Sequence, residues 1–326
     1  MKVSIFTVDA FTDHPFSGNP AAVVPLLQVR CVQLIRENII LVFTKYCLYD
    51  FFPLQEELMQ KLAGEMNLSE TAYVSPVGEE AAKEEPWVRC ARFSLRWFSP
   101  TTEVPLCGHA TLATAHVLFN ELGNCRTHVE FETLSGVLVA RKDSDNIVLD
   151  FPANTPVPLT PHQDTQLGPL LRVAMDGLQV QQVMLSHTTK KLLVRLHHSC
   201  TSFLNLHDGS LVKGIIYTLH GGLHVSNAQI TAPDSPQYHC LSRYFAPWNG
   251  IPEDPVTGEG IPITSFWRNV ETNYCPLCIL FLRRQCSPRG GDLLVTVRGD
   301  GRVDLAGRAT TIIQGYLTLT PPIKSG

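Results

Sequence analysis

The chain of 326 residues is long enough for two domains with separate hydrophobic cores, and its 44% hydrophobic and 17% charged residues are ordinary for a globular protein. The net charge of −4 and the pI near 6.3 exclude the basic surface of nucleic-acid-binding proteins, so we expect no nucleic-acid partner. No uninterrupted apolar run reaches the ~18 residues of a membrane span, so we expect no membrane segment.

The N-terminal segment predicts a strand and not a targeting peptide. Residues 2–8 read as a strand and lack the apolar core of a secretion signal. Ten cysteines are scattered along the chain, with one C-x-x-C at residues 275–278 and no second ligand pair at zinc-finger spacing. We therefore expect a cytoplasmic protein with reduced thiols and no bound metal.

The next stretch predicts a second strand, an irregular segment and a helix. Asn19 lies in a loop rich in turn-forming residues and is most simply a turn residue itself, before a strand at 21–27. Residues 28–53 contain two apolar runs split by charges, fit helix and strand equally well, and suggest an insertion. The following segment has apolar residues at helical spacing (Leu58, Leu62 and Met66, with Met59 and Ala63 beside them), which predicts an amphipathic helix that ends at Asn67.

Glu70 lies between this helix and a strand-like run at residues 71–74. A carboxylate at such a junction is either an exposed loop charge or a partly desolvated base with a raised pKa. Spacing alone favours the exposed charge, because surface glutamates are common. The polar and charged residues 75–90 then predict a solvated loop.

The segment from Arg96 to Leu122 predicts a strand, a proline-containing loop and a buried helix. The helix opens at Cys107-Gly108-His109 and has almost no polar side, which is typical of a helix that is buried on all sides. Its N-terminus would present backbone N–H groups with a partial positive charge. Such a terminus readily binds a carboxylate or a phosphate.

The same order of residues recurs 243 − 96 = 147 positions later. The run RYFAP at 243–247 corresponds to RWFSP at 96–100, and PVTG at 255–258 corresponds to PLCG at 105–108. Each copy continues into two strand-like runs with an Asp- or Gly-rich turn between them, which predicts hairpins. Between the two copies, residues 165–220 alternate strand-like runs with loops, and we predict strands and loops there. The pattern predicts a duplicated domain, in which each copy wraps strands around one buried helix.

Four motifs follow one another along the chain, namely GNPAAV at 18–23, MNLSET at 66–71, PLCGHAT at 105–111 and EDPVTG at 253–258. Together and in this order they resemble the phenazine-biosynthesis F family of isomerases. The resemblance covers nearly the whole chain and is weak in three segments, 28–53, about 155–240 and 259–285.

The resemblance implies an α+β, diaminopimelate-epimerase-like fold. That fold has two pseudo-symmetric domains, each a curved, mostly antiparallel sheet around a central buried helix, with the active site in the cleft between them. The expected domains are residues 1–152, which include the insertion at 28–53, and residues 153–326. Dimers are common in the family, so we also expect a homodimer.

The resemblance further implies an isomerase or epimerase that moves a proton on a small carboxylate without a cofactor. The role of acid and base falls on Glu70, and His109 and Asp254 would orient the substrate or relay a proton. For His109 the alternative is a helix N-terminal residue that hydrogen-bonds to backbone. Such a reaction needs a base with a pKa near neutrality and donors that stabilise the developing negative charge. The expected substrate-binding residues are Asn19, Cys107, Gly108, Thr257 and Gly258.

Cys107 leaves two further mechanisms to consider. In related racemases a cysteine at this helix start is one of two catalytic thiols, and a helix N-terminus lowers a thiol pKa. The second copy has Thr257 at the corresponding position, so a one-base isomerase is favoured over a two-thiol racemase. A cysteine hydrolase that uses Cys107 and His109 is the other mechanism.

The chain departs from the family pattern after Thr257-Gly258. The family continues with Ser-Ala-His, whereas this chain has Glu259-Gly260-Ile261. A negative charge at this helix start would repel a carboxylate substrate. Together with the apolar insertion at 28–53, Glu259 motivates an alternative function, a catalytically weak family member that binds protein partners.

Overall fold

The computed structural model describes eight stretches of the chain: 2–27, 55–175, 178–197, 212–220, 238, 240–247, 251–258 and 280–318. The predicted insertion at 28–53, Glu259 and the C-x-x-C at 275–278 lie outside these residues. The chain forms two compact units, each described by itself below. Unit 1 comprises Met1–Val8, Pro20–Arg141 and Thr311–Gly326, and unit 2 comprises Asp9–Asn19 and Lys142–Thr310.

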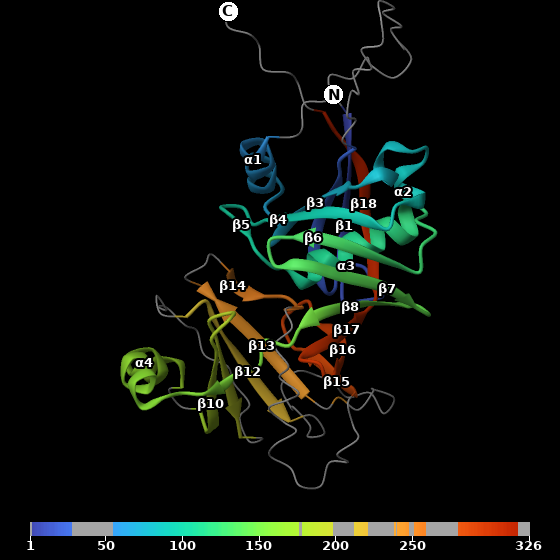
Figure 1. Ribbon diagram of the computed structural model, residues 1–326. Helices are drawn as coiled ribbons and strands as arrows, with labels where there is room; N and C mark the ends of the chain where they lie inside the picture. Colours follow the sequence, from blue (N-terminus) through green and yellow to red (C-terminus); the bar gives the residue numbers. More distant parts are fainter. Residues whose placement is uncertain are drawn as a thin grey trace, which may run out of the picture. The chain divides into compact units, whose positions relative to one another are not determined.

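Unit 1 consists of strands around one central helix (Figure 1). Its elements are β1 (Lys2–Ala10), β2 (Asn19–Pro25), α1 (Glu56–Met66), β3 (Glu70–Pro76), η1 (Glu79–Ala82), α2 (Pro86–Arg89), β4 (Arg92–Phe98), β5 (Glu103–Val104), α3 (Gly108–His116), η2 (Val117–Glu121), β6 (His128–Thr133), β7 (Gly136–Asp143) and β18 (Ala309–Thr318). Strand β1 pairs with both β2 and β18.

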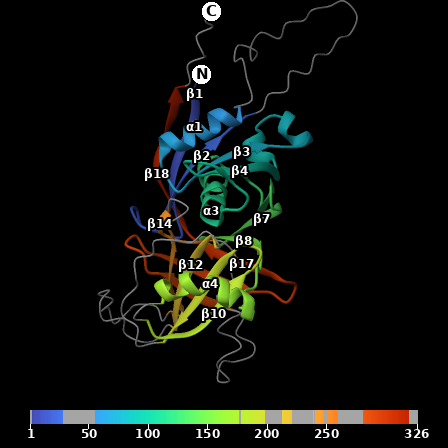
Figure 2. The ribbon, with the colours of Figure 1, turned by 90° about the vertical axis from the view of Figure 1, so that its left-hand side faces the viewer.

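Helix α3 is the predicted buried helix. All nine of its residues are buried, and Figure 2 shows it among the strands of unit 1. Its two threonines bury their hydroxyls without loss of hydrogen bonds, because Thr111 donates to the Cys107 carbonyl at 2.5 Å and Thr114 to the Ala110 carbonyl at 2.7 Å. The helix continues into the π-helical turn η2, and the prediction is confirmed.

The predicted amphipathic helix is α1. It ends at Asn67, which adopts the left-handed conformation with φ 49° and donates its N–H to Ala63. The buried side chains are Met59, Leu62 and Ala63, whereas Leu58 is exposed. The buried side chains all belong to the predicted apolar face, and Met66 packs against the same core, so that only Leu58 departs from the prediction.

Unit 2 consists, in its described residues, of strands and one helix. Its elements are β8 (Asn146–Pro152), β9 (Val157–Pro158), α4 (Pro161–Ala174), β10 (Val180–Ser186), β11 (Lys191–Leu196), β12 (Gly214–His220), β13 (Cys240–Ala246), β14 (Ile251–Asp254), β15 (Leu280–Gln285), β16 (Gly291–Val297) and β17 (Arg302–Gly307). The segment expected to form a second buried helix after residue 258 lies outside the described residues.

The strand pairings confirm the predicted duplication. In unit 1, β2–β3 is parallel, β3–β4 antiparallel, β4–β5 antiparallel, β4–β6 parallel and β6–β7 antiparallel. In unit 2, β11–β12, β12–β13, β13–β14, β13–β15 and β15–β16 have the same senses in the same order. The predicted second hairpin is β16–β17, and β17 also pairs with β8, the corresponding strand of the first copy.

The expected division of the chain into domains 1–152 and 153–326 remains a prediction. The compact units assign the short stretch 9–19 to unit 2 and the C-terminal stretch from Thr311 to unit 1. Unit 2, built mainly from the second copy, therefore includes a segment near the N-terminus. Unit 1, built mainly from the first copy, includes the C-terminal segment.

Side chains as well as strands are repeated. Arg96 forms an ion pair with Glu103 at 2.7 Å, and Arg243, 147 positions later, forms one with Glu253 at 2.5 Å. Each arginine also lies over the ring of the phenylalanine two residues further along its strand, at 5.1 and 5.0 Å. The sequence repeat therefore encodes a repeated local structure.

Helix α4 is an element that the sequence interpretation missed, because residues 165–220 were predicted to be strands and loops. Thr160 and Gln163 form a capping box at its start. Leu167 and Leu171 pack with buried side chains of β10, β11 and β12, such as Leu192. The Gly168-Pro169 pair inside the helix is a poor helix signal and obscured it.

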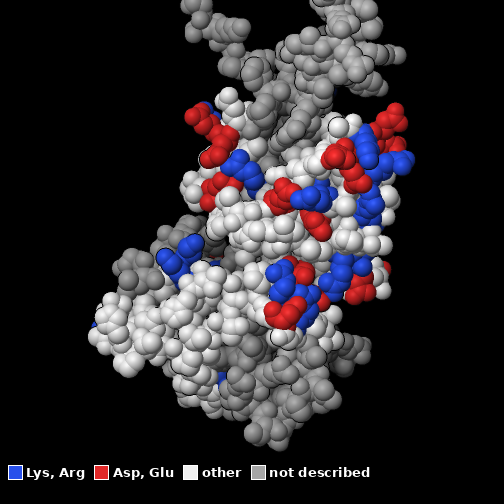
Figure 3. Space-filling view, in the orientation of Figure 1, with Lys and Arg blue, Asp and Glu red and all other residues white. Residues whose placement is uncertain are grey.

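None of the described helices is long and apolar enough to cross a membrane. On the face in Figure 3, basic and acidic side chains of the described residues are intermixed, as expected from ion pairs such as Arg92–Glu132 and Arg126–Glu80.

The end of α3 adds a pH-dependent contribution to stability. His116 is buried, with Nε2 3.1 Å from Thr311 Oγ1 and Nδ1 2.9 Å from Asn120 Nδ2. Burial lowers the His116 pKa below its ordinary 6.5, against the opposing effect of Glu121. The folded protein therefore favours neutral His116. The stability that this preference adds is complete above about pH 6.5 and is lost as the pH falls through the lowered pKa.

We expect urea unfolding midpoints to fall more steeply below about pH 6.5 for the wild type than for His116→Gln. The exposed His128 provides the matched control, since His128→Gln should keep the wild-type pH dependence. Equal pH dependence in the wild type and in His116→Gln would contradict the assignment.

Candidate active site

A cluster of three polar side chains lies at the N-terminus of α3 in unit 1. Glu70 is the first residue of β3 and is 9% exposed. Its Oε2 lies 3.2 Å from Nε2 of His109, whose Nδ1 lies 3.5 Å from Sγ of Cys107. The interpretation of Glu70 as an exposed loop charge is therefore wrong.

The helix start beside this cluster is suited to an anion. Cys107 is the N-cap residue of α3 and gives no side-chain hydrogen bond to the first turn. The first-turn N–H groups, beginning with Gly108, therefore keep their partial positive charge without a side-chain cap. A carboxylate or a developing oxyanion is the group that such a helix end stabilises.

A second polar cluster surrounds Asp254 in unit 2. Asp254 is buried at the end of β14 and accepts hydrogen bonds from Asn19 Nδ2 at 2.8 Å and from Thr257 Oγ1 at 2.6 Å. Asn19 Nδ2 also donates to the Val256 carbonyl at 2.9 Å. Asn19 is completely buried, so it holds this cluster together and is not a simple turn residue.

Two residues that the sequence interpretation missed complete the second cluster. Gln285 donates Nε2 to the Asp254 carbonyl at 2.7 Å, and its Oε1 accepts from the Thr257 N–H at 2.9 Å and from Arg283 Nη2 at 3.0 Å. Arg283 is buried and also donates Nε to Ser242 Oγ at 2.8 Å. The expected donor at Thr257 is therefore already engaged. The signal in the sequence was a polar pair at the end of an apolar run in β15.

Burial governs the ionisation of Asp254. Desolvation raises its pKa above the ordinary 3.8, and the hydrogen bonds from Thr257 and Asn19 and the positive charges of Lys191 and Arg283 act in the opposite direction. The folded protein therefore binds this proton more readily than the unfolded chain. The contribution to stability is present below about pH 3.8 and is lost as the pH rises through the raised pKa.

We expect Asp254→Asn to weaken this pH dependence. As the pH rises above about 4, the urea midpoint of the wild type should fall relative to that of Asp254→Asn, which cannot ionise. Unfolding curves at several pH values measure the difference. The exposed Asp164 of α4 is the control, because Asp164→Asn should follow the wild type. A constant gap between the wild type and Asp254→Asn would exclude the raised pKa.

The two copies differ at the position of Glu70. Thr71 pairs with Phe98 in unit 1, and Ile215 pairs with Phe245, 245 − 98 = 147 residues later, in unit 2. The residue that corresponds to Glu70 is therefore Gly214. A Cβ atom there would lie 2.3 Å from Tyr244 Cε2, so the Tyr244 ring occupies the space. The second copy has no acid at this position.

Comparisons with known proteins agree with the motifs. The model of the phenazine biosynthesis-like protein family matches residues 8–315. The chain belongs to this family. It is 39% identical over 330 residues to a phenazine biosynthesis-like domain-containing protein of Rattus norvegicus, with 98% of this chain and 100% of that protein covered. It is 33% identical over 326 residues to an uncharacterized isomerase of Pseudomonas aeruginosa, with the same coverage.

Solved structures confirm the predicted fold. A phenazine biosynthesis protein of Enterococcus faecalis matches with a TM-score of 0.69 and 28% identity, over 98% of this chain and all of that one. A hydroxyproline epimerase of Agrobacterium vitis matches with a TM-score of 0.52 and 12% identity, over 98% and 94% of the two chains, which shows the fold alone. The predicted α+β, epimerase-like fold is confirmed, and relatives named isomerases support an isomerase role at the level of the family.

Within this family member, the predicted site residues form two groups. Unit 1 contains Glu70, Cys107, Gly108 and His109, and unit 2 contains Asn19, Asp254, Thr257 and Gly258. One donor atom each from Glu70, Cys107 and His109 lies within 4.8 Å of the others, so these three side chains are the described residues that could hold a metal ion.

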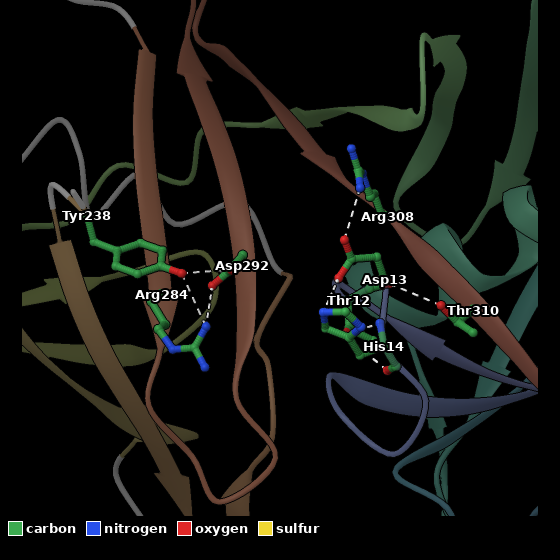
Figure 4. Close-up of polar contacts among 8 residues, drawn as sticks. All are labelled: Thr12, Asp13, His14, Tyr238, Arg284, Asp292, Arg308 and Thr310. Atoms are coloured by element: carbon green, nitrogen blue, oxygen red, sulfur yellow. Dashed lines mark hydrogen bonds and ion pairs between the residues drawn. The ribbon is translucent and has the colours of Figure 1, made fainter. Parts of the chain in front are cut away.

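Unit 2 also contains a cavity of about 360 Å³ between the loop at 11–17 and strands β15 to β17. Figure 4 shows its polar contacts, in which Arg284 binds Asp292 at 2.9 Å and Arg308 binds Asp13 at 2.9 Å. Tyr238 donates to Asp292 at 3.0 Å. Aspartates compensate the arginines of this cavity, and no histidine or cysteine lies beside a buried carboxylate among its described lining residues. We therefore place the chemistry at the clusters described above.

Proposed function

We propose that this chain is an isomerase or epimerase that moves a proton on a small carboxylate without a cofactor, with Glu70 as the acid and base. The observation that carries the proposal is the buried Glu70 carboxylate, 3.2 Å from His109 Nε2 and next to the uncapped start of α3. A base and a set of oxyanion donors are the two components that proton abstraction beside a carboxylate requires.

In the proposed reaction, the Glu70 carboxylate takes a proton from the carbon of the substrate and returns it at the new position. His109, whose Nε2 lies 3.2 Å from Glu70 Oε2, orients Glu70 or the substrate. Backbone N–H groups at Gly108 and beyond stabilise the negative charge that develops on the substrate. Gly214 supports a mechanism with one base, because the second copy has no acid that corresponds to Glu70.

We propose further that the Asp254 cluster takes part in binding the substrate. Asn19 and Thr257 hold the Asp254 carboxyl in one orientation through both of its oxygens. A carboxyl held in this way can accept or donate a hydrogen bond at a defined position, which orients a substrate.

The test is hydrogen exchange with solvent. The purified protein is incubated in D2O with a panel of small carboxylates, including hydroxy and amino acids, and deuterium at the α-carbon is measured by NMR. The proposal expects enzyme-dependent deuterium incorporation in at least one panel member. Absence of incorporation across the panel, from protein shown to be folded, would count against an isomerase.

The 3.5 Å distance between Cys107 Sγ and His109 Nδ1 also favours a second candidate, a cysteine hydrolase. Labelling of Cys107 with iodoacetamide distinguishes the two, with ester hydrolysis and hydrogen exchange measured on the same sample. The hydrolase requires both labelling and loss of ester turnover. The alternative of a protein-binding family member remains a prediction, since Glu259 and residues 28–53, on which it depends, lie outside the described residues.

A further inference from the structure

The three side chains at the start of α3 are also a set of metal ligands. We propose that Glu70, Cys107 and His109 bind one zinc ion, and that bound zinc inhibits the enzyme by occupying the base. The inhibition rests on the proposed function, because it requires Glu70 to act on the substrate. The binding itself is independent of that function.

The geometry is close to what zinc requires. One ligand atom from each of the three residues lies within 4.8 Å of the other two, and all three residues are buried. In a tetrahedral site with metal–ligand distances of about 2.0–2.3 Å, the ligand atoms lie about 3.3–3.8 Å apart. The ligand atoms therefore have to close by no more than about 1 Å, within the reach of side-chain rotation.

The positions of the ligands are well supported by the fold. Cys107 is the N-cap of α3 and His109 lies in its first turn, so their separation is fixed by the helix backbone. Glu70 begins β3, every residue of which is buried. Ligands held on a helix start and a buried strand lose little freedom when a metal binds.

The chemistry of the ligands selects zinc over magnesium or calcium. Thiolate and imidazole are ligands of Zn²⁺, whereas Mg²⁺ and Ca²⁺ require oxygen ligands in larger number. The Cys107 thiolate and the Glu70 carboxylate together balance the two charges of the ion, which a buried site needs. The positive end of α3 opposes a cation, but it also favours the thiolate form that binds the metal.

The ligand count predicts how zinc acts. Three protein ligands leave a fourth position open, as in catalytic zinc sites, where water or a carboxylate can bind. Glu70 bound to zinc through one carboxylate oxygen is a weaker base, because the ion withdraws its negative charge, and it is held at the metal instead of at the substrate carbon. Zinc at one equivalent should therefore stop hydrogen exchange, and removal of zinc by EDTA should restore it.

The binding test uses Co²⁺ as a spectroscopic probe for Zn²⁺. The reduced, chelator-treated full chain is titrated with Co²⁺, and the thiolate-to-cobalt absorption is followed until Zn²⁺ displaces it. We expect this absorption in the wild type and its loss in Cys107→Ser. The control is Cys90→Ser, which removes another buried thiol of unit 1 and should keep the absorption.

Calorimetry with Zn²⁺ provides a second measurement. The wild type should bind one equivalent more than Cys107→Ser and should release a proton from the thiol, seen as a heat that varies with the buffer. If Cys107→Ser fails to fold by circular dichroism, Glu70→Gln must lose the same equivalent. Equal zinc stoichiometry in the wild type and in the folded variants would overturn the proposal, as would cobalt absorption that persists in Cys107→Ser.

The outcomes separate this inference from the proposed function. Hydrogen exchange in a protein that binds no zinc at this site would refute only the zinc site. Zinc binding in a protein that, free of metal, exchanges hydrogen on none of the carboxylates would confirm the site and count against the isomerase.

Discussion

Glu70→Gln should reduce solvent-hydrogen exchange at the substrate carbon by about 10²–10⁴-fold, the usual contribution of a positioned general base. Glutamine has nearly the same size and can keep the 3.2 Å contact with His109 Nε2, so the cluster at α3 should remain assembled. It cannot take up a proton at neutral pH. The loss should therefore appear in the rate of the chemical step and only weakly in KM.

The chain offers a matched control for this variant. Glu121, at the other end of the α3–η2 helical segment, lies 3.7 Å from His116 and also belongs to unit 1. Glu121→Gln removes a carboxylate from a similar Glu–His pair away from the proposed site, and exchange should stay at the wild-type rate. If Glu70→Gln retained full exchange, or if both variants lost it equally, Glu70 would not be the base.

Local patterns in the sequence were sufficient to predict the central helix and the duplication. Helix α3 and the turn that follows it combine small and apolar residues with few polar ones, a composition that is typical of a helix buried on all sides. The repeat at 147 residues reappears as strand pairings of the same sense and as the pairs Arg96–Glu103 and Arg243–Glu253. The helix follows from residues that are neighbours in the chain, and the duplication follows from the similarity of two stretches. Both kinds of pattern can be read directly from the sequence.

Features that depend on long-range packing could not be read in this way. The burial of Glu70 results from the start of α3, which comes almost 40 residues later. Asn19 and Asp254 are 235 residues apart and meet only in the folded unit. Gln285 and Arg283 look like exposed strand residues in the sequence, and only pairing in the sheet turns them toward Thr257 and Ser242. Without the family resemblance, neither cluster would have been assembled from spacing alone.

Gly18→Ala should be strongly destabilising and should also disrupt the Asp254 cluster. Gly18 has φ 66°, and a Cβ atom would lie 2.2 Å from the Ala10 carbonyl oxygen and 2.8 Å from Thr12 Cγ2. The residue cannot shift to relieve these contacts without losing two hydrogen bonds. Its N–H donates to the Gly290 carbonyl at 2.7 Å, and its carbonyl accepts from Arg289 Nε at 2.9 Å.

Two effects add in this variant. The left-handed conformation costs about 1–2 kcal/mol for a residue with a side chain, and overpacking against backbone costs a further 1–3 kcal/mol or so. We expect the free energy of unfolding to fall by about 2–5 kcal/mol in urea titrations. Because Asn19 directly follows Gly18, its hydrogen bond to Asp254 should weaken. The rate of deuterium incorporation into the substrate should then fall along with the stability of the protein.

Gly123 separates the two effects, since it has φ 68° and a Cβ atom there would meet no described neighbour within 4 Å. Gly123→Ala should therefore show only the conformational cost, about 1–2 kcal/mol, and should leave exchange unchanged in the folded protein. A Gly18→Ala variant no less stable than Gly123→Ala would mean that the 11–19 loop does not hold Asn19 as described. The Asp254 cluster would then be anchored without this loop, and the coupling between the loop and Asp254 would have to be abandoned.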